Sequence, residues 1–234
     1  MIQQIPGEPE KLERFFVTNQ IYNKLFTNLN QHNEKTKKFI LYSVISEIIA
    51  LVKRSVAPRK ISAASPNAHF LLHLSQQNET IFTLLSGIIS LDNNLFIPYS
   101  DPNDFKEETE PYLKAITGYS AIYAYYLFSD LPIATKFRLK MAWIFISQLC
   151  NQPPNYASAS ILDVFLEVGA PKLLFVYKEA FKNILHIIYT DWWSWVESSF
   201  QSKNISIHNS FRRIKTSIEK LLPQETQNWK WKQL

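Results

Sequence analysis

Two histidines, His69 and His73, have the spacing that best fits metal chemistry. They lie four positions apart in the run HFLLH, so on a helix both imidazoles would project from the same face. A zinc site needs a third protein ligand, and a metalloprotease would place a glutamate directly after the first histidine. Phe70 stands at that position, and the sequence offers no obvious third ligand. We therefore interpret the pair as surface or half-buried histidines and expect no metal.

Paired acidic residues are the next candidates, because two carboxylates on one helix face could act as general acid and base. Asp163 and Glu167 have this four-residue spacing. They are expected opposite an apolar stripe, so we interpret them as a solvated helix face. The chain also lacks the glycine-rich phosphate loops and the nucleophile elbow found in many enzymes. The sequence therefore predicts no catalytic residue, and we expect that the protein is not an enzyme.

The basic residues are scattered along the chain. Separate groups occur around positions 35–38, 53–60 and 212–215. The formal net charge of +5 at pH 7 favours acidic partners but is too small to indicate nucleic acid. Lys53 and Arg54 stand where a helix is expected to end, and cations there interact favourably with its last carbonyls. Each group is explained first as a solvated helix end, with binding of an anionic ligand as the alternative.

Composition indicates the elements that position these residues. Of 234 residues, 46% are hydrophobic and 14% aromatic, yet only four are glycine. So few glycines disfavour a large β-protein or a dinucleotide-binding fold. The twelve prolines fall mostly between apolar segments, as expected at helix boundaries. The sequence thus predicts an all-α fold.

Periodic apolar residues predict eight or nine helices arranged as antiparallel hairpins in a single stack. We expect Ser65 to cap the helix that Pro66 opens, and Pro132 to open another. The expected ranges are about 10–30, 34–56, 65–75, 77–91, 106–129, 132–151, 160–169, 171–189 and 206–222. A proline- and aspartate-rich loop is expected at 95–105. We place one domain at 1–222 and a loosely attached tail at 223–234.

The segment from Ser160 to Tyr189 is predicted to form a helical hairpin. Apolar residues recur at helical spacing on both sides of Gly169 and Pro171. A glycine followed by an early proline is typical of one helix ending and another beginning. Such hairpins build stacked helical scaffolds, so this segment favours a binding protein.

Clustered aromatic residues add a further signal. They are Tyr119, Tyr123, Tyr125 and Tyr126 in one predicted helix, and Trp192, Trp193 and Trp195 after the hairpin. Most such side chains belong to a core, although exposed ones also anchor partners. Basic residues are interleaved too sparsely to indicate base stacking, so we expect no direct sequence-specific binding of nucleic acid. The single cysteine, Cys150, is interpreted as a buried structural thiol, and no apolar run is long enough to predict a membrane span.

Four runs in a fixed order carry a family resemblance: YLKAITGYSAIYAYYL, MAWIFISQLCNQPP, ASILDVFLEVGAPKLLFVYKEAFKNILHII and SFRRIKTSIEKLL. Together they resemble the C-terminal domain of the nucleoporin Gle-one family, the GLFG-lethal mediators of mRNA export. The most specific positions are Gly118 within its helix, Trp143 before a proline-ended segment, and the run from Phe165 to Gly169. The resemblance covers about 112–222 and is weak before Pro66.

The resemblance implies a HEAT-like or MIF4G-like helical stack that works as an adaptor without catalysis. Family members act at the cytoplasmic face of the nuclear pore complex. There they bind and stimulate a DEAD-box RNA helicase that removes export factors from mRNA, and a small FG nucleoporin binds the same domain. We accordingly expect a monomer with these partners, at the pore or in the cytoplasm. The family's long N-terminal coiled coil is missing, so we expect either a trimmed piece or a lineage that keeps this domain alone.

In fungal members, inositol hexakisphosphate bridges the domain and the helicase. Binding so highly charged a ligand requires several convergent cations. The resemblance places Lys53 and Arg54 in the first basic group of this pocket, and leaves only Lys106 and Lys114 in the third. The second group, in SGIISLDNN, has no basic residue, and the third region is acidic. The pocket is therefore predicted to be degraded. The alternative function is a generic helical scaffold that binds protein or RNA without activating a helicase.

Overall fold

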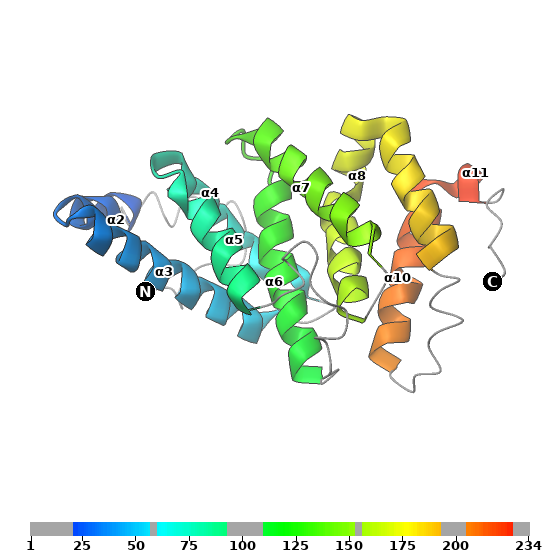
Figure 1. The fold of residues 1–234 in the computed structure, drawn as a ribbon, viewed down its shortest axis with the longest axis horizontal. Helices are drawn as coiled ribbons and strands as arrows, with labels where there is room; N and C mark the ends of the chain where they lie inside the picture. Colours follow the sequence, from blue (N-terminus) through cyan, green and yellow to red (C-terminus); the bar gives the residue numbers. More distant parts are fainter. Residues whose placement is uncertain (1–20, 57–59, 93–109, 153–155, 193–204, 227–234) are drawn as a thin grey trace.

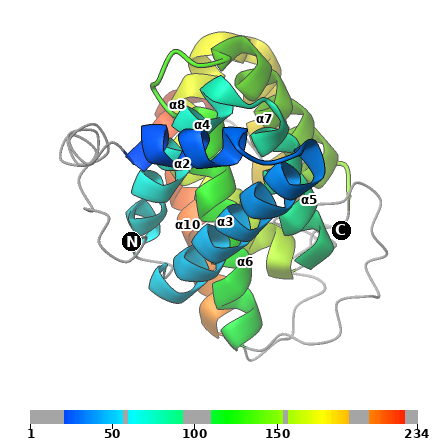
Figure 2. The ribbon, with the colours of Figure 1, turned by 90° about the vertical axis from the view of Figure 1, so that its left-hand side faces the viewer.

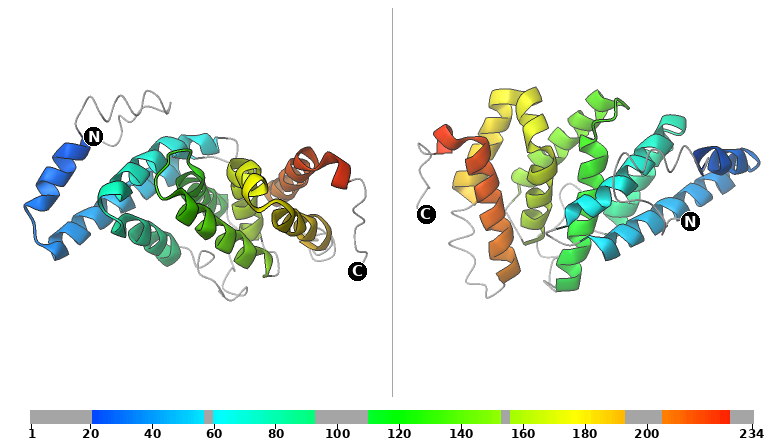
Figure 3. Two further views of the ribbon diagram at one scale, coloured as in Figure 1. Left: turned by 90° about the horizontal axis from the view of Figure 1, so that it is seen from above. Right: turned by 180° about the vertical axis from the view of Figure 1, so that it is seen from behind.

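The described part of the chain consists of helices arranged in a stack. The computed structural model describes residues 21–56, 60–92, 110–152, 156–192 and 205–226, and within these ranges there is no strand. The helices follow chain order from α2 at one end to α10 and α11 at the other (Figure 1). In the end view, α2 and α3 lie in front of the later helices (Figure 2), and the chain order is visible again from above and behind (Figure 3). The predicted all-α stack is confirmed. None of the described helices is both long and apolar enough to cross a membrane.

The first layer consists of α2 (Ile21–Asn30) and α3 (Glu34–Ser55). The predicted bounds of α3 are confirmed to within one residue, whereas the predicted helical residues 10–20 lie outside the described residues. Asn33 caps α3, because its side-chain oxygen accepts a hydrogen bond from the Thr36 amide at 2.9 Å. The buried face of α3 is aliphatic, and its buried residues are Leu41, Ile45, Ile48, Ile49 and Val52.

The next layer begins with a 3₁₀ turn, η2 (Ile61–Ala64), which runs directly into α4 (Ser65–Gln77) and is followed by α5 (Thr80–Asp92). The expected cap at Ser65 is wrong. Ser65 is itself helical, since its amide donates to the Ser62 carbonyl and continues η2 into α4. Pro66 does occupy the first turn of α4, as predicted. The loop predicted at 95–105 lies outside the described residues.

The centre of the stack is α6 (Glu110–Phe128), which packs against α3, η2, α4, α7 and α8. Tyr119, Tyr123 and Tyr126 are buried, which confirms them as core residues. Gly118 allows the close approach of α3. A Cβ at this position would lie 3.0 Å from the Cα of Lys53, so a larger residue would push the two helices apart.

A buried arginine holds the turn between α6 and α7 (Thr135–Cys150). Only 1% of Arg138 is exposed, and its guanidinium donates six hydrogen bonds to five backbone carbonyls. The acceptors are the carbonyls of Tyr126, Leu127, Ser129, Leu131 and Ile133, at 2.6 to 3.2 Å. Lys172 donates to the remaining carbonyl, that of Phe128. Cations thus satisfy the carbonyls that α6 leaves without intrahelical partners.

The start of α7 differs from the prediction by three residues. Pro132 precedes the helix but does not open it. Ala134 has a positive φ of 46°, a backbone conformation outside the right-handed helical region, so regular α7 begins at Thr135. The end of α7 at Cys150 agrees with the predicted end at Asn151 to within one residue.

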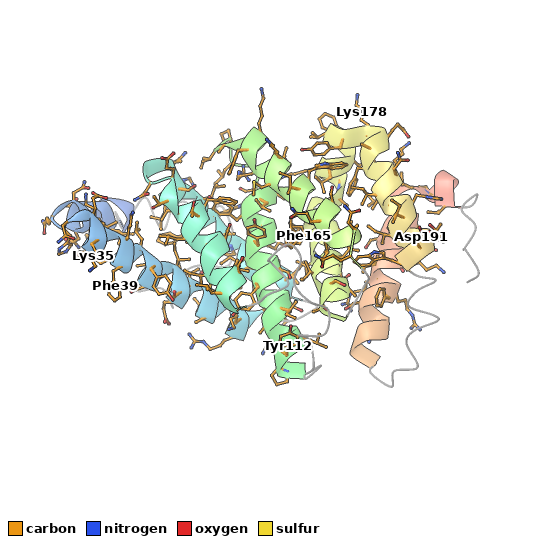
Figure 4. All side chains as sticks on the ribbon, viewed as in Figure 1. Lys35, Phe39, Tyr112, Phe165, Lys178 and Asp191 are labelled. Carbon is orange, nitrogen blue, oxygen red and sulfur yellow. The ribbon has the colours of Figure 1, made fainter. Side chains whose placement is uncertain are left out.

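The hairpin predicted between Ser160 and Tyr189 exists, but its corner was predicted at the wrong place. α8 (Tyr156–Ile187) continues through both Gly169 and Pro171 and bends at Lys178, which has φ 45° and ψ −119°. Gly169 serves packing, because a Cβ there would overlap the ring of Phe128. The corner at Lys178 and the returning arm toward Asp191 are visible in Figure 4.

The last layer contains η5 (Ile188–Trp192), α10 (Ile205–Leu221) and α11 (Pro223–Thr226). α10 packs on α8 through an ion pair in which Arg213 contacts Asp163 at 2.5 Å and 2.7 Å. The interpretation of Asp163 as part of a solvated face is wrong, because Asp163 is only 6% exposed. Glu167 is exposed, as predicted. Burial raises the pKa of Asp163 to about 6, although Arg213 acts in the opposite direction.

Candidate functional site: a basic corner between α3 and α6

Four cationic residues lie where the end of α3, the start of η2 and the first half of α6 pack together. We call this group the basic corner, and its members are Lys53, Arg54, Lys60 and Lys114. Lys53 and Arg54 belong to the last turn of α3, Lys60 directly precedes η2, and Lys114 lies one turn before Gly118 on the same face of α6. Lys106, which was also predicted for this site, lies outside the described residues.

Lys53 is the most firmly held member of the basic corner. It is half-buried, and its ammonium donates a hydrogen bond to the Tyr119 hydroxyl at 2.6 Å while lying 4.7 Å from the centre of the ring. This position depends on Gly118, which lets the α3 backbone approach α6. The packing leaves Lys53 little freedom, so less side-chain entropy would be lost when it contacts a ligand.

The other three cations are exposed to solvent. Arg54 forms only a loose ion pair with Glu47, at 3.5 Å, and both side chains are more than half exposed. Lys60 and Lys114 form no ion pair with any described residue. An anion would therefore displace little at these three side chains, because exposed ion pairs contribute at most about 1 kcal/mol. The end of α3 contributes no attraction, since its dipole is negative there.

The basic corner contains features that the sequence prediction did not include. Lys60 was counted among the basic residues near position 53, but not with the predicted pocket. Lys60 directly precedes η2, and η2 contacts both α3 and α6, so only the packing of these elements brings Lys60 to the corner. The contact between Lys53 and Tyr119 was also missed, and the glycine before Tyr119 was the only local signal for close helix packing.

The two histidines of α4 are half-buried, which confirms their interpretation. Burial and the neighbouring His73 lower the pKa of His69 below its ordinary value. Among the described residues, no group of three potential ligands is placed to hold a metal ion. Cys150 is half-buried in α7, and burial raises the pKa of its thiol to about 12. A thiol with so high a pKa is a poor nucleophile, as expected for a structural cysteine.

These features define a class: an all-helical stack with a group of cations at one corner and, among the described residues, no cluster of side chains placed to hold a metal ion. The model of the GLE1-like protein family matches residues 4–189, which is most of the chain. The chain therefore belongs to the GLE1-like protein family. No curated protein and no solved structure matches it at the threshold applied.

Family membership connects the chain with mRNA export and the nuclear pore. Members are adaptors and activators rather than enzymes. The matched region reaches from α2 through the returning arm of α8, and it includes all four residues of the basic corner.

Proposed function

We propose that this chain binds the DEAD-box RNA helicase of mRNA export and stimulates its ATPase, without catalysis of its own. The observation that carries the proposal is the family match over residues 4–189, which spans the central stack and its basic corner. An adaptor of this kind increases turnover by binding one arrangement of the two helicase lobes more tightly than the others. We further propose that it acts at the cytoplasmic face of the nuclear pore complex and binds a small FG nucleoporin.

The basic corner is the proposed contact for an anionic bridge between the two proteins. Inositol hexakisphosphate would meet Lys53 and Arg54 from α3, Lys60 from η2 and Lys114 from α6. Arginine and lysine suit phosphate groups because they offer several charged donors. Four cations are few for so highly charged a ligand, and α5 contributes none. We therefore propose that the ligand binds weakly and that stimulation does not depend on it.

A pull-down from the source organism, followed by an ATPase assay with the recovered helicase, tests the proposal. The chain should raise the RNA-dependent ATPase rate of its helicase, both with and without inositol hexakisphosphate. Lys53→Ala with Arg54→Ala should weaken the binding of inositol hexakisphosphate and leave the stimulation measured without this ligand unchanged. A matched double variant of exposed lysines on α7, Lys136→Ala with Lys140→Ala, should change neither the binding nor the stimulation.

The outcomes separate the proposal from its alternative. An unchanged ATPase rate across a range of RNA and inositol phosphate concentrations would rule out helicase stimulation. Recovery of other partners in the same pull-down would then favour a generic helical scaffold. Stimulation that requires inositol hexakisphosphate would keep the helicase assignment and overturn the proposed independence from the ligand.

A further inference from the structure

The solvent face of α3 near its N-terminus carries two exposed aromatic rings beside two lysines. Lys35, Lys38, Phe39 and Tyr42 occupy positions i, i+3, i+4 and i+7, so they form one continuous stripe on the helix. Phe39 is 69% exposed and Tyr42 is 44% exposed. We call these four residues the α3 stripe. Figure 4 labels Lys35 and Phe39 at the α2–α3 end of the molecule, far from Lys178 and Asp191.

The chain segment that carries the α3 stripe is mostly basic. Residues 21–46 contain four lysines and a single acidic residue, Glu34. The carboxylate of Glu34 pairs with the ammonium of Lys37 at 2.9 Å, which leaves Lys35 and Lys38 without an ion pair among the described residues. Neither ring of the stripe stacks on a described aromatic residue. Among the described residues, the stripe thus presents unstacked rings beside lysines that form no ion pair.

We propose that the α3 stripe binds single-stranded RNA without sequence preference. Sites of this kind combine cations that follow the phosphate backbone with aromatic side chains on which bases stack. Lys35 and Lys38 supply the phosphate contacts, and Phe39 and Tyr42 supply the stacking surfaces. A duplex would leave the rings unused, because its bases already stack on one another.

A protein partner fits these observations less well. Two exposed rings on one helix form a small apolar patch, well below the area that a stable protein interface buries. The stripe is also distinct from the basic corner. Lys35 and Lys53 are 18 positions apart on one helix, which corresponds to about 27 Å along its axis. RNA binding at the stripe therefore does not rely on helicase stimulation, and either proposal can fail alone.

The test measures fluorescence anisotropy of a fluorescein-labelled 15-nucleotide oligouridine RNA with the purified chain, between 50 and 200 mM KCl. With two phosphate contacts, the slope of log affinity against log salt should be about −1.4. Lys35→Glu with Lys38→Glu should abolish binding. Phe39→Ala with Tyr42→Ala removes two stacking rings and should lower the affinity by at least about thirtyfold while preserving the salt slope.

Two control variants carry the same changes elsewhere. Phe175→Ala removes a ring that is 82% exposed but lies four positions from the acidic residue Glu179. Lys136→Glu with Lys140→Glu reverses the charge of two exposed lysines on α7. Both should bind RNA as the unaltered chain does. Circular dichroism should show the same helical content for all four variants, because every altered side chain is exposed.

Several results would overturn the proposal. These are undetectable binding at 50 mM KCl, an equal loss of affinity in the control variants, or a 15-base-pair RNA duplex that binds as tightly as the single strand. An oligoglutamate peptide could also compete with the RNA. If it bound as tightly as the RNA, and if this binding were lost with Phe39→Ala, the stripe would bind an acidic protein segment instead.

Discussion

Replacement of Arg138 should be among the most damaging single changes in this protein. Its guanidinium is buried and forms no ion pair with a described residue; backbone carbonyls, the negative end of the α6 dipole and the nearby carboxylate of Asp130 stabilise its charge. Three of its acceptor carbonyls, those of Tyr126, Leu127 and Ser129, belong to buried residues. Arg138→Met would leave them without a donor.

The expected magnitude follows from those three carbonyls. A buried acceptor that loses its donor costs about 1–3 kcal/mol, so three of them give about 3–9 kcal/mol. Methionine fills much of the vacated volume and removes a costly buried charge, which places the expected loss at about 3–5 kcal/mol. A loss of that size lowers the melting temperature of a chain this long by about 6–20 °C. It is a large fraction of the stability of most domains.

Urea unfolding followed by circular dichroism would measure this loss for a graded series. Arg138→Lys retains the charge but has only three donors for five carbonyls, so it should lose about 1–3 kcal/mol. Arg54→Met, at a side chain that is 66% exposed, should change the free energy of unfolding by less than about 0.5 kcal/mol. The reasoning would be refuted if Arg138→Met matched Arg54→Met, or if lysine at 138 destabilised the protein more than methionine.

Two further predictions concern single positions. Gly169→Ala should lower the free energy of unfolding by about 1–3 kcal/mol, because its Cβ would overlap the ring of Phe128. Gly87→Ala, in an exposed part of α5 with open space around it, should raise that free energy by about 0.5–1 kcal/mol, so equal effects in a thermal melt would contradict the packing argument. Asp163 has a folded pKa of about 6, above its unfolded value of 3.8, so the folded state binds its proton more tightly. Its contribution to stability should therefore be fully present below about pH 3.8 and fall by about 3 kcal/mol in all as the pH rises from there through 6. The free energy of unfolding of Asp163→Asn should lack this pH dependence. If the wild type instead gained stability relative to the variant as the pH rose, pairing with Arg213 would outweigh burial.

Most helix boundaries could be predicted because apolar periodicity and proline positions report on local structure. α3, α4 and α10 follow this rule to within about two residues. The corner of α8 could not be predicted. Gly169 looks like a helix terminator in the sequence. In the structure it is a packing position, because the ring of Phe128, about forty positions away in the chain, occupies the space that a Cβ would need. The actual corner, at Lys178, has neither a glycine nor a proline to mark it.

Long-range pairing limited the prediction of polar residues in the same way. Asp163 was assigned to a solvated face because its helix alone suggests one, and its partner Arg213 comes 50 residues later. Arg138 was not singled out, because a lone arginine near the start of a helix is usually exposed. For the basic corner, Lys53, Arg54 and Lys114 were named from the resemblance. Their approach to Lys60 required the packing of α3, η2 and α6.

The two faces of α10 have a consequence for assembly. Phe211, Ile214 and Ile218 are buried against the preceding layer, whereas Arg212, Thr216 and Lys220 are exposed on its outer side. Open-ended helical arrays need a terminal unit with a polar exterior, because a bare apolar end invites further copies to add. α10 has a polar exterior of this kind. It disfavours growth of the stack into filaments by addition of a further copy on that surface.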